Sequence, residues 1–166
     1  MMDLIVAVDQ EWGIGKKNDL LFRIPEDMKF FRHITSGHTV VLGRKTLESF
    51  PGGKPLPNRK HIVLSRQETL DEENVCTVHS LCELLKKLET VRGEVYLIGG
   101  ASLYKQLYRQ CRYAYVTKIF ADGEAEVFFP DLDADPYFQL VEEGKKQISS
   151  SGLTFRFLRY ENIGLR

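Results

Sequence analysis

The chain has 166 residues, with 23 basic and 23 acidic side chains, so its formal net charge at pH 7 is zero. This length predicts a single domain over residues 1–166, and the neutral charge argues against a nucleic-acid-binding surface. The composition is 43% apolar, but no apolar run reaches the roughly 18 residues that span a membrane, which predicts a soluble globular protein without a membrane role.

The chain enters an apolar run directly after Met1-Met2-Asp3, with no basic leader, and we therefore expect a cytoplasmic protein. Its three cysteines show no CxxC spacing, and its four histidines show no metal-ligand spacing. We expect reduced thiols, no disulfide framework and no metal.

Apolar runs rich in β-branched residues predict strands along the chain. They cover residues 4–8, 39–42, 61–64, 75–78, 95–98 and 113–120. Several are continuously apolar, as in a mostly parallel sheet that is covered on both faces. Helical patterns lie between them, at residues 25–34, 80–88 and 100–108. The last two strand-like segments, at 137–146 and 154–161, alternate in polarity and predict an antiparallel hairpin. The predicted fold is therefore an α/β domain whose mixed, mostly parallel central sheet is flanked by helices and carries an antiparallel C-terminal hairpin.

The predicted helix at residue 25 has an acid on its apolar side. If Pro25 is the first helical residue, Asp27 lies in the middle of the arc formed by Phe30, Phe31 and Ile34. An acid in a first turn often only complements the helix dipole. That explanation suits Glu26 better than Asp27, which we expect to be either paired or functional.

Two long irregular stretches, residues 9–24 and 50–60, interrupt the pattern. Irregular segments of this length in a compact domain are usually functional. The first precedes the predicted helix and is placed to cover the site that Asp27 faces. The second is rich in proline and glycine, which predicts a loop of defined conformation and not a flexible one.

Three predicted strands end in residues that suit a phosphate. They are followed by Gly43-Arg44-Lys45-Thr46, by Ser65-Arg66 and by Gly99-Gly100-Ala101-Ser102. Ligands of open α/β sheets bind at these carboxyl ends, where glycines, cations and free N–H groups hold phosphates. No GxGxxG is present, and Arg44, Ser65 and Arg66 suit a 2′-phosphate, so the sequence favours NADP over NAD.

Taken together, these residues resemble the dihydrofolate reductase family over nearly the whole chain. The matching motifs, in order, are Leu4-Ile5-Val6-Ala7, Gly13-Ile14-Gly15, Ile24-Pro25-Glu26-Asp27-Met28-Lys29-Phe30-Phe31, Gly43-Arg44-Lys45-Thr46, Leu56-Pro57-Asn58-Arg59, Ile98-Gly99-Gly100 and Phe128-Phe129-Pro130. The resemblance implies reduction of 7,8-dihydrofolate to 5,6,7,8-tetrahydrofolate by hydride from NADPH, in support of one-carbon metabolism. It further implies that Asp27 is catalytic and promotes protonation of the pteridine N5, and that Arg59 holds the folate α-carboxylate.

The resemblance also implies two sets of binding residues. The substrate set is Ile5, Val6, Ala7, Phe22, Met28, Phe31, Phe50, Leu56, Arg59, Ile98, Tyr104 and Thr117. The cofactor set is Ala7, Ile14, Gly15, Leu20, Gly43, Arg44, Lys45, Thr46, Ser49, Leu64, Ser65, Arg66, Ile98, Gly99, Gly100, Ala101, Ser102, Leu103 and Tyr104. Antifolate inhibitors are plausible ligands, and we expect a monomer.

The chain departs from the family pattern in three places. Leu20-Leu21-Phe22 stands where many members have Leu-Pro-Trp, Ser102 where some have a basic residue, and Leu47, interpreted as packing, where Trp is frequent. Two other readings are a reductase of another heterocycle, such as the pyrimidine reductase domains of riboflavin synthesis, and a silent NADP-binding module. The combination of Asp27, Phe31 and Arg59 argues against both.

Overall fold

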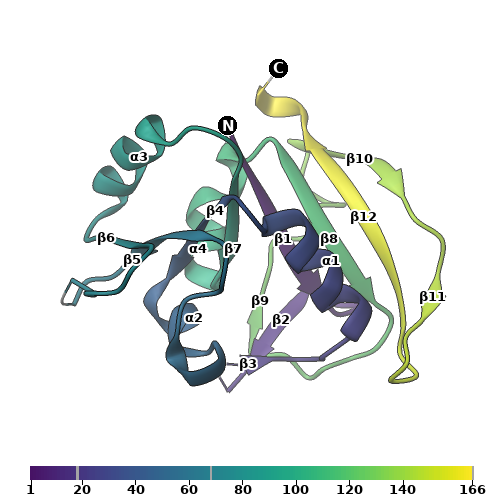
Figure 1. Cartoon of the computed structure of the whole chain (residues 1–166). Helices are drawn as coiled ribbons and strands as arrows, with labels where there is room; N and C mark the ends of the chain where they lie inside the picture. Colours follow the sequence, from purple (N-terminus) through teal and green to yellow (C-terminus); the bar gives the residue numbers. More distant parts are fainter. Residues whose placement is uncertain (18, 68, 166) are drawn as a thin grey trace.

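The computed structural model describes residues 1–17, 19–67 and 69–165. A central sheet has the strand order β10-β12-β8-β1-β7-β4-β5-β6 (Figure 1). Its strands are β1 (Met2–Val8), β4 (Thr39–Gly43), β5 (Lys60–Leu64), β6 (Val75–Val78), β7 (Val95–Gly99), β8 (Tyr113–Ile119), β10 (Phe138–Glu143) and β12 (Thr154–Asn162). The predicted mixed sheet is confirmed, since β1, β4, β5, β6, β7 and β8 pair in parallel whereas β12 runs antiparallel to both β8 and β10.

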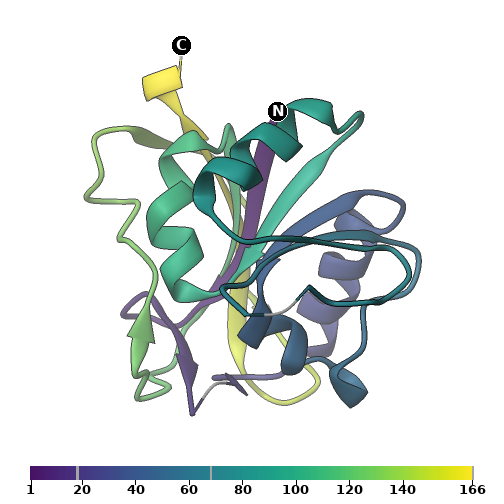
Figure 2. The same ribbon diagram turned by 90° about the vertical axis from the view of Figure 1, so that its left-hand side faces the viewer.

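Helices cover both faces of this sheet. The helices α1 (Pro25–Thr35) and α2 (Arg44–Glu48) lie on one face, and α3 (Leu81–Thr90) and α4 (Ala101–Leu107) lie on the other (Figure 2). Neighbouring residues of one strand serve opposite faces: Leu42 packs with Leu47 of α2, whereas Val41 belongs to the core beneath α3 and α4. This double coverage explains the continuously apolar strands.

The helix α1 begins at Pro25, as predicted, and is fixed to the sheet by Phe30. The ring centroid of Phe30 lies 4.6 Å from that of Phe157 on β12 and 6.4 Å from that of Tyr115 on β8. This packing places the inner side of the first helical turn over β8. None of the helices in the described parts of the chain is both long and apolar enough to cross a membrane.

Residues 9–24, predicted to be irregular, contain two short strands. The strand β2 (Gly13–Lys16) pairs with β3 (Asp19–Leu20) and with β9 (Val127–Phe128), forming a small antiparallel sheet at the end of the molecule opposite the two termini (Figure 1). The buried carboxylate of Asp9 sets this arrangement, because it accepts hydrogen bonds from the backbone N–H groups of Gly13 (2.7 Å) and of Gly123 (3.0 Å).

The predicted C-terminal hairpin is antiparallel, but its first strand is interrupted. The strand β10 ends at Glu143, and a separate β11 (Gln147–Ile148) also pairs with β12. At the break, the N–H of Gly144 donates to the carbonyl oxygen of Phe157 at 2.8 Å. A Cβ on residue 144 would lie 3.0 Å from that oxygen, so the close approach requires glycine. Short 3₁₀ turns complete the fold at Pro51–Gly53, Tyr108–Gln110 and Ile163–Leu165.

Candidate functional site

Asp27 lies on the inner side of α1 and contacts a threonine of β8. Its Oδ1 accepts a hydrogen bond of 2.6 Å from the hydroxyl of Thr117, a residue that pairs in register with Ala7 of β1. Burial raises the pKa of the Asp27 carboxyl above its usual value, and the hydrogen bond from Thr117 opposes this rise. No cation of the described residues pairs with Asp27, and the hydrogen bond from Thr117 is the contact that holds its carboxyl group. Glu26, by contrast, accepts a hydrogen bond from the N–H of Ser150 at 3.2 Å and has a structural partner.

Arg59 is a buried cation for which the described residues supply no acidic partner. Its Nε donates to Thr35 Oγ1 at 2.8 Å and its Nη1 to the carbonyl oxygen of Pro57 at 3.0 Å, and its Cζ lies 5.8 Å from the ring centroid of Phe31. Only 6% of Arg59 is exposed, and no carboxylate of the described residues pairs with it. Burial, and then the charge of Arg32, lower the pKa of its guanidinium. Buried charges are normally paired, so the geometry suits an anionic ligand group at Arg59.

A groove of about 1060 Å³ opens at the carboxyl ends of β1, β4, β5 and β7. Every residue of the predicted cofactor set lines it, so sequence segments far apart in the chain meet here. Those residues are Ala7, Ile14, Gly15, Leu20, Gly43, Arg44, Lys45, Thr46, Ser49, Leu64, Ser65, Arg66, Ile98, Gly99, Gly100, Ala101, Ser102, Leu103 and Tyr104. The arrangement agrees with the rule that ligands of α/β sheets bind at the carboxyl ends of the strands.

Further lining residues lie outside the predicted cofactor set. They are Val6, Lys16, Lys17, Glu48, Gln67, Gln106, Glu126 and Val127. The sequence offers a reason to place Glu48 in the groove, since it stands four residues after Arg44 on the same helix face. It offers no such reason for Glu126 and Val127, because they reach the groove only through the pairing of β9 with β2.

The groove's glycines and cations form a surface that suits phosphates. A Cβ on Gly100 would lie 3.2 Å from Thr46 Oγ1, so backbone and hydroxyl approach each other closely only because residue 100 has no side chain. Arg44 Nε donates to Glu48 Oε1 at 2.9 Å, whereas Arg44 Nη1 is buried and finds no hydrogen-bond partner among the described residues. The hydroxyl oxygen of Ser65 accepts from the N–H of Gln67 at 3.1 Å, which leaves its proton free to donate. A phosphate-bearing dinucleotide fits this donor set.

The predicted substrate residues are divided between the groove and its α1 side. Val6, Ala7, Ile98 and Tyr104 line the groove. The remainder, Ile5, Phe22, Met28, Phe31, Phe50, Leu56, Arg59 and Thr117, are not among the groove's lining residues, and neither is the predicted catalytic residue Asp27. Two contacts connect the two groups: the buried hydroxyl of Tyr104 donates to the carbonyl oxygen of Ile5 at 2.7 Å, and Ala7 packs in a cluster with Phe22. Burial, followed by the charges of Cys111 and Asp27, raises the pKa of Tyr104, which keeps its hydroxyl protonated.

The structure shows which residues surround each of the three departures from the family pattern. Leu47 is 4% exposed and packs in the core, which agrees with the packing interpretation. Leu21 lies against Gly123, where an added Cβ would come within 2.8 Å of it. The hydroxyl of Ser102 accepts from the amide of Gln106 at 3.1 Å and adds no charge to the groove.

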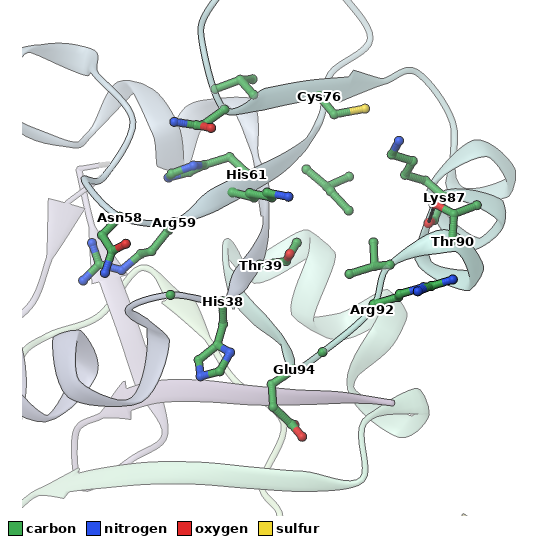
Figure 3. A pocket seen from close by; sticks show the side chains of 17 residues that line it. His38, Thr39, Asn58, Arg59, His61, Cys76, Lys87, Thr90, Arg92 and Glu94 are labelled. Atoms are coloured by element: carbon green, nitrogen blue, oxygen red, sulfur yellow. Dashed lines mark hydrogen bonds between the residues drawn. The ribbon is translucent and has the colours of Figure 1, made fainter.

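A second cavity, of about 780 Å³, lies at the edge of the sheet opposite to the groove, at the amino ends of β4, β5, β6 and β7 (Figure 3). Asn58 and Arg59 stand at one end of it and Lys87 and Arg92 at the other, where the two cationic side chains extend in different directions (Figure 3). Lys87 complements the carboxyl end of α3. Because these cations do not converge, we take the groove and the α1 side as the candidate site. Within the described ranges, no cluster of His, Cys, Asp and Glu side chains suits a metal ion.

An α/β sheet whose groove at the strand ends suits phosphates, near a half-buried acid, is the arrangement expected of a nicotinamide-dependent oxidoreductase. A family model for dihydrofolate reductase matches residues 1–162. The chain is 36% identical over 161 residues to the dihydrofolate reductase of Bacillus subtilis (strain 168), covering 97% of this chain and 94% of that one. It is 34% identical over 163 residues to the dihydrofolate reductase of Staphylococcus haemolyticus, covering 98% and 96%.

A solved structure agrees with these relatives. The dihydrofolate reductase of Enterococcus faecalis, complexed with NADP(H) and RAB-propyl, superimposes with a TM-score of 0.86 at 32% identity and covers 97% of this chain and 95% of its own. The chain belongs to the dihydrofolate reductase family, whose members reduce 7,8-dihydrofolate to tetrahydrofolate. The predicted enzyme class and the predicted cofactor, NADPH, are thereby confirmed.

Proposed function

We propose that Asp27 is the catalytic residue of this reductase and that it promotes protonation of N5 of dihydrofolate. The observation that carries the proposal is an unpaired, half-buried carboxylate fixed by Thr117 beside the cofactor groove. Addition of hydride to an imine carbon is slow unless the nitrogen gains positive charge, so the reaction needs an acid at this place.

The surroundings of Asp27 give the carboxyl the properties that this role requires. Burial raises its pKa, so it keeps a proton at higher pH than a solvated aspartate does. The hydrogen bond from Thr117 fixes Oδ1 and leaves Oδ2 to accept from the amino group and ring nitrogen of the pteridine. Thr117 is therefore proposed as the residue that orients the acid.

Two aromatic side chains and one cation are proposed to hold the rest of the substrate. Phe31 and Phe50 are half-buried and are proposed to sandwich its rings, while Met28 and Leu56 border them. Arg59, held by Thr35 and by the Pro57 carbonyl, is proposed to bind the α-carboxylate through the remaining N–H groups of its fork. Ile5 is proposed to contact the reacting ring through its backbone.

The groove is proposed to hold NADPH, which supplies the hydride when it is bound. The N–H groups at the start of α4, together with Thr46 and Ser49, are proposed to bind its diphosphate, and Arg44, Ser65 and Arg66 its 2′-phosphate. The buried Nη1 of Arg44, for which the described residues supply no hydrogen-bond partner, supports this assignment. The segment carrying Ile14 and Leu20 is proposed to cover the nicotinamide.

The test is the loss of reduced-nicotinamide absorbance when the purified protein receives dihydrofolate and either NADPH or NADH. Faster oxidation of NADPH, with Arg44→Ala and Arg66→Ala each reducing that preference, is the expected result. Equal rates with both cofactors would overturn the assignment of Arg44 and Arg66. Binding of NADPH without turnover of dihydrofolate would favour a silent module or another heterocycle.

We further propose that the enzyme acts as a cytoplasmic monomer and that antifolate inhibitors bind beside Asp27. The three cysteines, all within the described ranges, are free thiols, which supports a reducing compartment. Sedimentation of the purified protein tests the oligomeric state.

A further inference from the structure

Glu48 is an acid in the wall of a groove proposed to bind phosphates. Its carboxylate lines the groove together with Arg44, and its Oε1 accepts a hydrogen bond of 2.9 Å from Arg44 Nε. A negative charge beside an anion site weakens anion binding unless it has another effect. The position of Glu48 therefore requires an explanation.

Helix stability does not provide that explanation. Arg44 is the first residue of α2 and Glu48 the last, so each carries the sign of charge that the helix dipole disfavours at its end. The order of the pair, with the cation four residues before the acid, is also the weaker one on a helix. Glu48 is half exposed, with 56% of its side-chain surface accessible, and exposed pairs contribute little to folding.

The hydrogen-bonding pattern of Arg44 indicates an orienting role instead. A guanidinium group offers donors along two edges, and Glu48 occupies Nε. The end of the fork that remains includes Nη1, which is buried and has no hydrogen-bond partner in the described parts of the chain. Glu48 thus fixes the Nε side of the flexible Arg44 side chain and leaves the other N–H groups of the guanidinium for a ligand. Bidentate binding of a phosphate depends on this kind of fixed fork.

We propose that Glu48 is a positioning residue that holds Arg44 in the orientation required for the 2′-phosphate of NADPH, and that it thereby contributes to the preference for NADPH over NADH. The inference rests on the proposed role of Arg44. In this proposal, Glu48 does not touch the cofactor. The gain from a fixed guanidinium exceeds the repulsion between the carboxylate and the phosphate, because Arg44 lies between the two charges and screens them.

The experiment measures dissociation constants of NADPH and NADH by isothermal titration calorimetry, without dihydrofolate, for Glu48→Ala, Glu48→Gln, Arg44→Ala and the double variant Arg44→Ala/Glu48→Ala. Glu48→Ala is expected to weaken NADPH binding about 3- to 10-fold, a part of what a charge-assisted contact contributes, and to leave NADH binding unchanged. Glu48→Gln keeps an acceptor for Arg44 Nε and should stay within about twofold of the parent. In the Arg44→Ala background, loss of Glu48 should have no further effect.

A matched control is Glu142→Ala, which removes another exposed ion pair, with Arg159 at 3.2 Å, far from the groove. It should change neither dissociation constant. Tighter or unchanged NADPH binding in Glu48→Ala, an equal effect on NADH, or an undiminished effect in the Arg44→Ala background would each overturn the proposal. If Arg44→Ala itself leaves the NADPH preference intact, the assignment of Arg44 fails first and the role of Glu48 fails with it.

Discussion

Replacing Thr117 by valine tests the proposed catalytic unit most directly. Valine nearly preserves the shape of the 1%-exposed threonine but cannot donate the 2.6 Å hydrogen bond to Asp27 Oδ1. A hydrogen bond to a charged group contributes about 1.5–3 kcal/mol to stability. In a protein of this size, a loss of that magnitude lowers the melting temperature by about 3 to 12 °C.

The substitution should also shift the pH dependence of the reaction. The hydroxyl of Thr117 stabilises the charged carboxylate and lowers the pKa of Asp27, against the larger effect of burial. Without it the pKa rises further, so the fall of kcat/KM for dihydrofolate with increasing pH should begin at higher pH. The stability loss should be largest above the pKa of folded Asp27 and smaller at acid pH, where the carboxyl is protonated in both proteins.

The assays are urea unfolding and the pH profile of kcat/KM, repeated in an Asp27→Asn background. The stability cost of Thr117→Val should fall to that of a neutral hydrogen bond, about 0.5–1.5 kcal/mol, in that background, because asparagine keeps an acceptor but carries no charge. Thr77→Val is the control: Thr77 Oγ1 accepts a bond from a neutral donor, the N–H of Leu70, and its loss should not move the pH profile. An unshifted profile for Thr117→Val, or an equal stability cost with and without Asp27, would refute the reasoning.

The remaining predictions concern three charged residues. Asp27→Asn should reduce turnover at neutral pH about 10²- to 10⁴-fold. Because its raised pKa makes folded Asp27 hold a proton that the unfolded chain has already released, stability falls as pH rises from the ordinary value of 3.8 through the folded pKa. Asp27→Asn should remove this fall and be more stable than the parent in neutral urea titrations, and lower stability there would contradict the burial argument. Arg59→Lys loses the planar guanidinium fork and should raise KM for dihydrofolate about 10- to 100-fold in steady-state assays, while KM for NADPH stays unchanged. Equal changes in both constants would exclude the folate α-carboxylate as the ligand of Arg59. Asp9→Asn replaces one of two accepting oxygens by a donor that must face backbone N–H groups, and should lower the free energy of unfolding in urea by about 1–3 kcal/mol. The control is Asp122→Asn, which changes an exposed aspartate. Equal small losses in both variants would show that Asp9 does not organise residues 9–24.

Local patterns in the sequence predicted the parts of the fold that depend on local rules. The strand from Thr39 is apolar throughout because both of its faces are buried, and Pro25 begins α1 because its ring suits a first helical turn. The residues that follow each parallel strand met in one groove because parallel strands end at the same edge of a sheet. The resemblance to the family supplied what local rules do not contain, namely the expectation that Asp27 and Thr117, which lie 90 residues apart, both face the substrate.

The missed features depend on contacts between distant segments. The strands β2 and β9 are short and pair across more than 100 residues, with the carboxylate of Asp9 binding Gly123 in the same region. Nothing in the sequence near Gly13 marks that pairing. The break after Glu143 has the same origin, since Gly144 approaches the backbone of Phe157 only in the folded sheet. The phosphate-binding pattern of the sequence does not predict Glu48 as a residue of the groove, because an acid is not expected among residues that suit phosphates.

The candidate site contains three charged groups that the described residues leave without a full set of partners. Within those residues Asp27 has no cation, Arg59 has no carboxylate, and Arg44 has a buried Nη1 without an acceptor. Among the described residues no ion pair joins two of these groups, and each is held by another residue: Asp27 by Thr117, Arg59 by Thr35 and Arg44 by Glu48. On the proposed assignments, the pteridine, the α-carboxylate and the 2′-phosphate each supply one missing partner. The free enzyme should therefore be less stable than its complexes, and each ligand at 100 times its dissociation constant should add about 2.7 kcal/mol to the free energy of unfolding.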